Sequence, residues 1–270
     1  MSQAKAAAGF LRHRGIGEPV ELAVVLGTGL GPIAETPDGP FVISYQELPG
    51  FPQTTIAGHA GRLAAGVQEG LRVAYLEGRA HYYEGGNAGA MITALETMAL
   101  LGAEIVLVTA IARSLRHGLY PGNIALITDH INLSGIDSLG RAPLDGRCLD
   151  LADAYDPRLR QRLKKASAMA GVGLQEAVYM WIPGPSFETP AEVKAACHLG
   201  ANVIGKSLVP EVIIARHLGL RAAALTAITN FAAGFSGGSP GRGETQSGAL
   251  AGTIGLKRLI RNFLRTRDEN

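Results

Sequence analysis

The sequence predicts an α/β fold, and three observations lead to this class. Short, continuous apolar runs that end at turn residues recur along the chain, which is typical of buried strands. Segments with helical character lie between these runs, and such alternation favours an α/β architecture. The 270 residues contain no internal repeat and no linker-like stretch, so we expect one domain over residues 1–270.

The expected strands are short and apolar. Residues 22–27 form an apolar run that stops at Gly27, and residues 62–78 divide into two strands around the turn dipeptide Glu69-Gly70. Further strands are expected over residues 104–109, 123–128, 175–182 and 221–229, with candidates over 41–45 and just before Gly205. Because ligands of open α/β sheets bind at the carboxyl ends of strands, the segments that follow these strands are the candidates for a site.

The expected helices cover residues 88–101, 157–170, 190–199, 210–218 and 245–265. Gly102 follows the first of them as a C-cap, and the second is basic and amphipathic, with its charges on a solvated face. Lys and Arg gather toward the end of the last helix, where they complement its dipole. Residues 232–244 are rich in Gly and Ser, and we expect them to form a mobile loop.

Composition limits the partners and the compartment. Hydrophobic residues make up 47% and charged residues 18% of the chain, as in ordinary globular proteins, and the net charge of +2 indicates neither nucleic acid nor an acidic membrane as a partner. No apolar run is long enough to span a membrane, and the N-terminus lacks the apolar core of a secretory signal, so we expect a cytoplasmic protein. The two cysteines, Cys148 and Cys197, provide neither a disulfide framework nor a zinc site.

A Gly-rich turn, residues 27–31, follows the first expected strand and contains Thr28. A loop of this kind between a strand and a helix can present backbone N–H groups and a hydroxyl to an anion, or it can be a tight turn only. A dinucleotide-binding fingerprint needs Gly-x-Gly-x-x-Gly and an acidic residue at the end of the next strand. The spacing here is Gly-x-Gly-x-Gly, and residues 41–45 end without an acid.

Cationic and hydroxyl groups follow other expected strands. Arg79 and His81 come directly after a strand, and His59 lies in a second Gly-rich segment. The planar fork of Arg matches phosphate oxygens, and His can donate to the same anion. Ser207 precedes a helix, where it can act as an N-cap or bind an anion. Arg-x-His also occurs as a surface ion pair, but the segments together favour an anion site formed by Thr28, Arg79, His81 and Ser207.

A second group of residues is suited to a planar base. Phe187 and Glu188 follow the Gly184-Pro185 turn, so a ring and a carboxylate are presented together, although Glu188 can instead cap the next helix. Asn230 ends a buried strand, where an amide can read a ring nitrogen and a neighbouring oxygen or simply form a turn. An anion site beside a base site is the layout needed to cleave a nucleoside with phosphate.

With these segments in place, the chain resembles the trimeric purine nucleoside phosphorylase family. The matching segments occur in the family's order and are residues 27–31, 57–62, 78–85, 129–133, 184–192, 209–212 and 229–230. The resemblance runs from about residue 20 to 265. It implies a single nucleoside phosphorylase-like domain, built on a mixed β-sheet flanked by helices and packed as a homotrimer with sites near subunit contacts.

The resemblance also implies roles for particular residues. Phosphate would be bound by Thr28, His59, Arg79, His81, Ser207 and the backbone at Ile111. The base and sugar would be contacted by Tyr83, Ala112, Phe187, Glu188, Lys206, Asn230 and Arg242, and the catalytic residues would be His81, Glu188 and Asn230. Asn rather than Asp at position 230 favours a 6-oxopurine such as hypoxanthine or guanine over adenine.

The implied reaction is phosphorolysis in nucleoside metabolism and purine salvage. The C1′–N9 bond breaks through an oxocarbenium-like transition state. Asn230 hydrogen-bonds N7 of the departing purine and Glu188 anchors its N1 side, while bound phosphate stabilises the sugar cation and then attacks C1′. The partners are a purine nucleoside and inorganic phosphate, and no metal or organic cofactor is needed.

The departures from the family surround the expected sugar site. The usual Asn-Ala-Ala-Gly is replaced by residues 110–113, Ala-Ile-Ala-Arg, so Arg113 adds bulk and charge beside the phosphate site. Lys206 stands where a Met usually precedes the phosphate-binding Ser. An aromatic that reaches a neighbouring subunit's sugar pocket aligns with Cys148, and Arg242 aligns with the His that meets the sugar 5′-hydroxyl.

Several functions therefore stay open. The chain can cleave 6-oxopurine ribonucleosides or deoxyribonucleosides, or it can take a sugar-modified or acidic nucleoside that pairs with Arg242 and Lys206. It can also be a purine nucleoside-binding homologue without activity. A nicotinamide-dependent dehydrogenase rests only on the first Gly-rich turn.

Overall fold

The computed structural model describes residues 2–16, 19–35, 38–56, 58–140, 148–235 and 242–266, without the side chains of residues 35, 38–40 and 242–251. The strands are β1 (Leu22–Leu26), β2 (Asp38–Ser44), β3 (Arg62–Gln68), β4 (Leu71–Glu77), β5 (Ile105–Ser114), β6 (Ile124–Ile131), β7 (Leu174–Trp181), β8 (Val203–Gly205) and β9 (Arg221–Phe231). The α-helices are α1 (Gln3–His13), α2 (Tyr82–Gly85), α3 (Ile92–Leu100), α4 (Pro157–Ala170), α5 (Pro190–His198), α6 (Val209–His217) and α7 (Arg242–Arg265).

The strands form one mixed sheet in the order β2-β3-β4-β1-β5-β8-β7-β6-β9. β1 pairs in parallel with both β4 and β5, whereas β2 and β3 extend the edge as antiparallel strands. The last strand, β9, also pairs in parallel with β5, so that β5, β8, β7, β6 and β9 close on themselves as a small barrel. This closure removes the free edges that β5 and β9 would otherwise expose.

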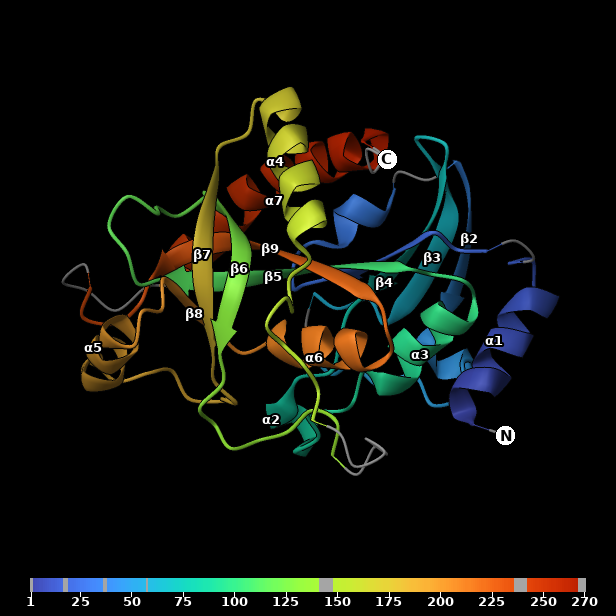
Figure 1. Ribbon diagram of the computed structural model, residues 1–270, viewed down its shortest axis with the longest axis horizontal. Helices are drawn as coiled ribbons and strands as arrows, with labels where there is room; N and C mark the ends of the chain where they lie inside the picture. Colours follow the sequence, from blue (N-terminus) through green and yellow to red (C-terminus); the bar gives the residue numbers. More distant parts are fainter. Residues whose placement is uncertain are drawn as a thin grey trace.

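Helices cover both faces of the sheet (Figure 1). α4 and α7 lie together on one face, where Leu163 and Phe263 pack against strand residues. α1, α3 and α6 lie on the other face, where Leu11 and Met98 belong to a second apolar cluster. β1 is buried along its whole length, and this explains its unbroken apolar sequence, since both of its faces contact helices or loops.

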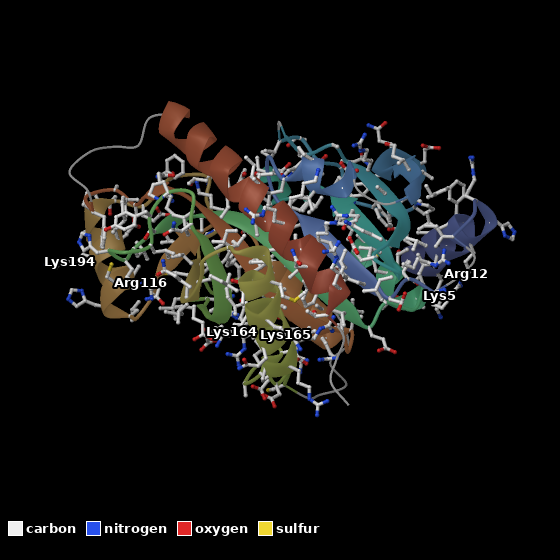
Figure 2. The ribbon with its side chains drawn as sticks, turned by 90° about the horizontal axis from the view of Figure 1, so that it is seen from above. Lys5, Arg12, Arg116, Lys164, Lys165 and Lys194 are labelled. Carbon is white, nitrogen blue, oxygen red and sulfur yellow. The ribbon has the colours of Figure 1, made fainter. Side chains whose placement is uncertain are left out.

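Charged side chains lie on the outside of these layers. Figure 2 shows Lys164 and Lys165 on the outward side of α4, Lys5 and Arg12 at the α1 end of the molecule, and Arg116 and Lys194 at the α5 end. Lys164 forms a half-exposed ion pair with Glu176. No helix among the described residues is both long enough and apolar enough to cross a membrane.

The predicted α/β class is confirmed, and so is the mixed sheet flanked by helices. The predicted helix over 157–170 has those bounds, and the turn at Glu69-Gly70 joins β3 to β4 with both residues at positive φ. The domain bounds of 1–270 stay a prediction.

The first residues of two expected helices differ in the structure. The helix expected from residue 88 begins at Ile92, and residues 88–91 form a turn in which a Cβ atom added at Gly89 would lie 2.8 Å from the carbonyl oxygen of Ser138. The helix that follows the first Gly-rich turn is a short 3₁₀ helix (Gly31–Glu35). Within the expected loop 232–244, residues 236–241 lie outside the described residues, and α7 begins already at Arg242.

The contact between α7 and β9 leads to a first testable prediction. A Cβ atom added at Gly252 would lie 2.5 Å from the Cβ of Ala227, so Gly252→Ala should force the helix off the sheet and lower the free energy of unfolding by about 1–3 kcal/mol. Gly9 lies in the interior of α1 with no atom within 4 Å of an added Cβ. Gly9→Ala should therefore raise the free energy of unfolding by about 0.5–1 kcal/mol.

Urea denaturation of both variants and of the parent protein measures these changes. Equal effects of the two substitutions would contradict the close approach of α7 to β9.

Candidate functional site

The segments singled out in the sequence meet at one end of the sheet. Gly27–Gly31 follow β1, Gly78–Glu84 follow β4, and Ser207 follows β8. Arg113 and Asn230 lie near the ends of β5 and β9 and are register partners across that parallel pair. This is the carboxyl edge of the parallel strands, where α/β sheets bind their ligands.

The Gly-rich turn after β1 lies directly against β5. A Cβ atom at Gly27 would be 3.0 Å from the Cα of Ala110 and from the carbonyl oxygen of Thr109, so only glycine fits there. The close approach fixes Thr28, whose hydroxyl lies 2.9 Å from Nε2 of His59.

The protonation state of His59 follows from its neighbours. Nδ1 lies 2.8 Å from the carbonyl oxygen of Arg79, which can only accept a hydrogen bond, and 3.3 Å from the backbone nitrogen of the same residue. The shorter contact requires the proton on Nδ1. Nε2 is then free to accept from the Thr28 hydroxyl. Burial and the nearby Arg79 guanidinium lower the pKa of His59 to about 4, so the ring is neutral at neutral pH.

His81 is fixed by a carboxylate three residues further along the chain. At the start of α2, Glu84 accepts from the backbone N–H of His81 at 2.6 Å and lies 3.0 Å from its Nδ1. Nδ1 is therefore the protonated nitrogen, and Nε2 is left as an acceptor. Burial and the Arg79 guanidinium lower the pKa of His81, in spite of the opposing carboxylate.

Three rings form a continuous stack along this edge. The ring centroids of His59 and His81 are 5.3 Å apart, and those of His81 and Tyr83 are 5.1 Å apart, each pair being close to parallel. Together with the Thr28 contact, the stack joins the segments that follow β1 and β4 to each other.

Arg79 is buried more deeply than a surface ion pair would be. Its side chain is 1% exposed and pairs with Glu211 of α6 at 2.8 Å, while Nη2 also donates to the carbonyl oxygens of Thr109 and Val25. Much of the guanidinium is thus engaged by the protein, which differs from the free phosphate ligand expected from the sequence. Within the described residues, Nε of Arg79 and Oε2 of Glu211 are buried without a hydrogen-bond partner.

Ser207 is positioned by an unusual turn. Leu208 has φ of 76° and ψ of −53°, and the backbone N–H of Val209 donates to the carbonyl oxygen of Ser207 at 2.9 Å, which forms a γ-turn. Leu208 is fully buried, so packing holds this strained conformation. The turn places Ser207 directly before the N-terminus of α6.

These residues converge on a small cavity. Arg79, His81, Lys206, Ser207 and Glu211 line a space of about 10 Å³, enough for roughly one water molecule. A pocket of about 320 Å³ opens beside it and shares Ala80 and His81 with it. A ligand larger than a water molecule fits the small cavity only if the cavity widens.

Two of the residues predicted to bind the base, Glu188 and Phe187, contact the guanidinium of Arg113. Nη2 of Arg113 lies 2.5 Å from Oε1 of Glu188 and also contacts Oε2, and both side chains are buried. The guanidinium carbon of Arg113 lies 4.2 Å from the centroid of the Phe187 ring, and Nζ of Lys206 lies 4.0 Å from the same centroid. Arg113 was expected beside the phosphate site, and its ion pair joins it to Glu188, one of the residues predicted to contact the base.

Lys206 also lies on this side. Its ammonium donates to the carbonyl oxygen of Pro185 at 2.8 Å, and partial burial together with the nearby Arg113 charge lowers its pKa. The two cations thus share one aromatic ring and one carboxylate. This grouping was not foreseen from the sequence, which placed Lys206 near the sugar.

Both the oxygen and the nitrogen of the Asn230 side-chain amide form hydrogen bonds within the protein. Its oxygen accepts from the hydroxyl of Thr229 at 2.7 Å, and its nitrogen donates to the carbonyl oxygen of Phe231 at 2.8 Å. The Thr229 hydroxyl also contacts the carbonyl oxygen of Ala112 at 3.3 Å. One N–H and one oxygen lone pair of the Asn230 amide are not used by these bonds and can contact a ligand.

The remaining predicted residues are less closely connected. Ile111 lies in β5 in register with Ala227, and a Cβ atom at Gly205 would be 3.3 Å from its carbonyl oxygen. Cys148 is exposed, and the side chain of Arg242 lies outside the described residues. Among the residues that the structure describes, no group of His, Cys, Asp or Glu is arranged to hold a metal ion.

Glu211 is the residue that sequence reasoning missed. It stands in the segment 209–212, which was matched to the family without a role for its carboxylate. An acidic residue in the first turn of a helix is ordinarily explained by the helix dipole. Nothing in the sequence pairs it with Arg79, which is 132 residues away.

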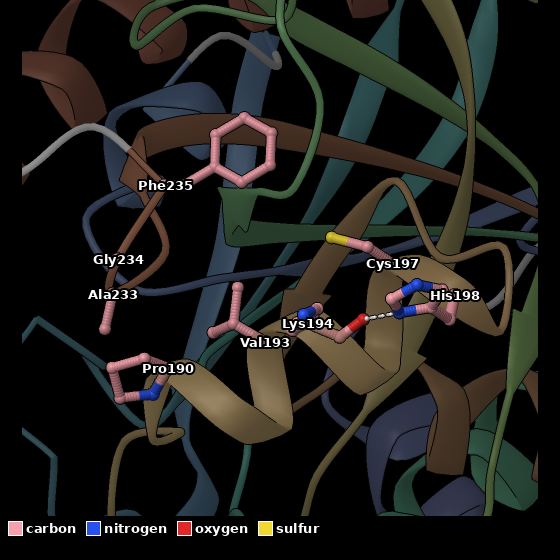
Figure 3. A pocket seen from close by; sticks show the side chains of 8 residues that line it. All are labelled: Pro190, Val193, Lys194, Cys197, His198, Ala233, Gly234 and Phe235. Atoms are coloured by element: carbon pink, nitrogen blue, oxygen red, sulfur yellow. Dashed lines mark hydrogen bonds between the residues drawn. The ribbon is translucent and has the colours of Figure 1, made fainter.

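A larger pocket, of about 450 Å³, lies elsewhere, between α5 and the segment after β9 (Figure 3). Val193 and Phe235 line it, and His198 is bound through Nδ1 to the carbonyl oxygen of Lys194 at 2.8 Å. None of the predicted site residues lines this pocket. We therefore place the candidate site at the carboxyl edge of the sheet, where the polar groups converge.

Comparisons with known proteins identify the family of this chain. A family model described as "Phosphorylase superfamily" matches residues 21–265. Purine nucleoside phosphorylase 1 of Bacillus subtilis is 36% identical over 232 residues, which are 85% of this chain and 85% of that protein. Purine nucleoside phosphorylase of Mus musculus is 40% identical over 220 residues, which are 78% of this chain and 75% of the mouse protein.

A solved structure gives the same result. Schistosoma purine nucleoside phosphorylase in complex with guanosine superposes with a TM-score of 0.89 at 28% identity and covers 99% of this chain and 98% of that one. The family match extends over most of the sequence, and the relatives exceed 30% identity over more than two thirds of the chain. The chain therefore belongs to the phosphorylase superfamily and, within it, to the purine nucleoside phosphorylase family.

Proposed function

We propose that this protein is a purine nucleoside phosphorylase that cleaves the N-glycosidic bond of purine nucleosides with inorganic phosphate. The products are the free base and a pentose 1-phosphate. The observation that carries the proposal is the convergence of Arg79, His81 and Ser207 on one cavity, in a chain whose relatives are purine nucleoside phosphorylases. We further propose a homotrimer in the cytoplasm that acts in purine salvage and needs no cofactor.

The phosphate half of the site is supported by the donor groups that line or adjoin the small cavity. Nε of Arg79 is buried without a partner, and the Ser207 hydroxyl lines the same cavity. Thr28 and His59 adjoin them through the ring stack, and the Thr28 hydroxyl can turn from His59 to an anion. Donors that are fixed in place before the ligand arrives lower the cost of binding it.

His81 is suited to manage the phosphate proton. Because Nδ1 donates to Glu84 and the ring is neutral, Nε2 can accept the proton of a monoprotic phosphate oxygen. A phosphate oxygen then forms the bond to C1′, the C1′–N9 electron pair leaves with the purine, and a proton returns to the base. No oxidation or reduction occurs in this exchange.

The base half would be formed by Phe187, Glu188 and Asn230, with Lys206 over the Phe187 ring and with Tyr83 and Ala112 nearer the sugar. The Arg113–Glu188 ion pair favours a second candidate, a purine nucleoside-binding homologue that does not turn its ligand over, because the carboxylate is already occupied. Binding of a purine without phosphate-dependent cleavage would support that candidate.

The proposed reaction is tested directly by product formation. Incubation with inosine, guanosine, xanthosine or a 5′-modified nucleoside should release free base only when phosphate is present, together with an equimolar pentose 1-phosphate. Chromatography of the products measures both. If none of these nucleosides is cleaved in the presence of phosphate, the proposal is wrong.

Ser207 provides a test of the phosphate contacts. Ser207→Ala should raise KM for phosphate by about 10- to 100-fold, because a hydrogen bond to a charged group contributes about 1.5–3 kcal/mol. Ser44→Ala is the control: its hydroxyl accepts only from the backbone N–H of Gln46, away from the site, so KM for phosphate should not change. Steady-state kinetics with varied phosphate distinguish the two, and an unchanged KM in Ser207→Ala would remove Ser207 from the site.

The lowered pKa of His59 predicts how stability depends on pH. In the unfolded chain the imidazole takes up its proton near pH 6.5, whereas in the folded protein it does so at about 4. Between these values the unfolded state binds more protons, so the free energy of unfolding should decrease as pH falls from 6.5 to 4, by up to about 3 kcal/mol from this residue.

Urea denaturation at a series of pH values measures this dependence. His59→Gln should make it shallower, while His198→Gln, on the exposed side of α5, controls for the loss of a histidine. Identical pH profiles of the parent protein and His59→Gln would contradict the assignment.

A further inference from the structure

The base end of the site carries an excess of positive charge. Arg113 and Lys206 contribute two cationic groups around the Phe187 ring, and Glu188 is the carboxylate that the structure pairs with them. The carboxylate oxygens face the guanidinium of Arg113. Oε1 accepts from Nη2 of Arg113, while Oε2 contacts the same guanidinium but is buried without a hydrogen-bond partner among the described residues. A base edge that approaches this pair therefore meets the donors of Arg113 beside the carboxylate, not a carboxylate alone.

We expect the Arg113–Glu188 ion pair to persist when a ligand binds. Arg113 is 7% and Glu188 is 6% exposed, so a base that took Glu188 for itself would leave a buried guanidinium without its counter-charge. Removing one partner of a buried ion pair is strongly unfavourable. The ring of Phe187 holds the guanidinium from one side, and the register pairing of Arg113 with Asn230 fixes its backbone.

The chemistry of the ligand follows from this arrangement. The N1–H is common to guanine and to the neutral 2,6-dioxopurines, so the substituent at C2 makes the difference. The 2-amino group of guanine would point donors at the donors of Arg113. A base with an oxygen at C2 would accept from Arg113, and a base that loses a ring proton near neutral pH would also meet the positive charge of Arg113 and Lys206. Purines with oxygen at both C2 and C6 combine these two properties.

We propose that Arg113 is a specificity-determining residue that selects nucleosides of 2,6-dioxopurines over those of 2-aminopurines. This inference rests on the proposed function, because it assumes that the base lies against Glu188. Glu188 then acts by positioning the guanidinium of Arg113, and Lys206 adds to the charge that favours an anionic base.

The test compares xanthosine with guanosine. In the parent protein, kcat/KM for xanthosine should exceed that for guanosine by at least tenfold. Arg113→Gln keeps much of the side-chain length without its charge, and Arg113→Gly removes the side chain, so both should lower this ratio by at least tenfold. Arg116→Gly is the matched control, since its guanidinium contacts the side chain of Gln175 and should leave the ratio unchanged.

Binding of the free bases provides a readout that does not depend on turnover. Calorimetry should give tighter binding of xanthine than of guanine to the parent protein, with the order reversed or lost in Arg113→Gln. A preference for guanine in the parent protein, or an unchanged preference in both Arg113 variants, would overturn the inference. Absence of phosphate-dependent cleavage of every nucleoside, with the xanthine preference retained in binding, would reject the proposed reaction and leave the inference standing.

Discussion

The parallel pairing of β5 with β9 is the constraint on which the rest of the structure depends. It closes the barrel, and its register places Arg113 opposite Asn230 at the edge where the candidate site lies. The register shifts between Ala112 and Arg113, and irregularities of this kind re-aim side chains next to functional sites. The pairing of β5 with β9 thus positions Arg113, whose side chain forms the ion pair with Glu188.

Much of the fold could be predicted because its strands are buried on both faces and its turns contain glycine. The run at 22–27 and the turn at Glu69-Gly70 are local signals, and they give strand positions directly. β5 and β9 extend beyond the predicted bounds, because their last residues are ordered by pairing with each other and with β8. α1 was not predicted: its apolar stripe is made largely of alanines, and only its packing against α3 shows that it is buried.

The candidate site was predictable in outline and less so in its charges. The sequence indicates which segments follow strands, so Arg79, His81 and Ser207 could be grouped together. It does not indicate that Glu211 neutralises Arg79, or that Arg113 turns to Glu188, because both pairs join residues that are distant along the chain. Both pairs follow from the cost of burying a charge, because a guanidinium removed from water needs an anionic partner nearby. Which carboxylate lies nearby depends on the fold.

The closed barrel has a consequence for the way the chain reaches its native state. β9 is the last strand in the sequence and lies between β5 and β6, so the barrel cannot close until residue 231 has joined residues more than a hundred positions earlier. Until then β5 and β6 expose unpaired edges, which are templates for association with other chains. Contacts so distant along the chain form slowly, and we therefore expect the nascent protein to depend on its full length, and on assistance against aggregation, before it becomes compact.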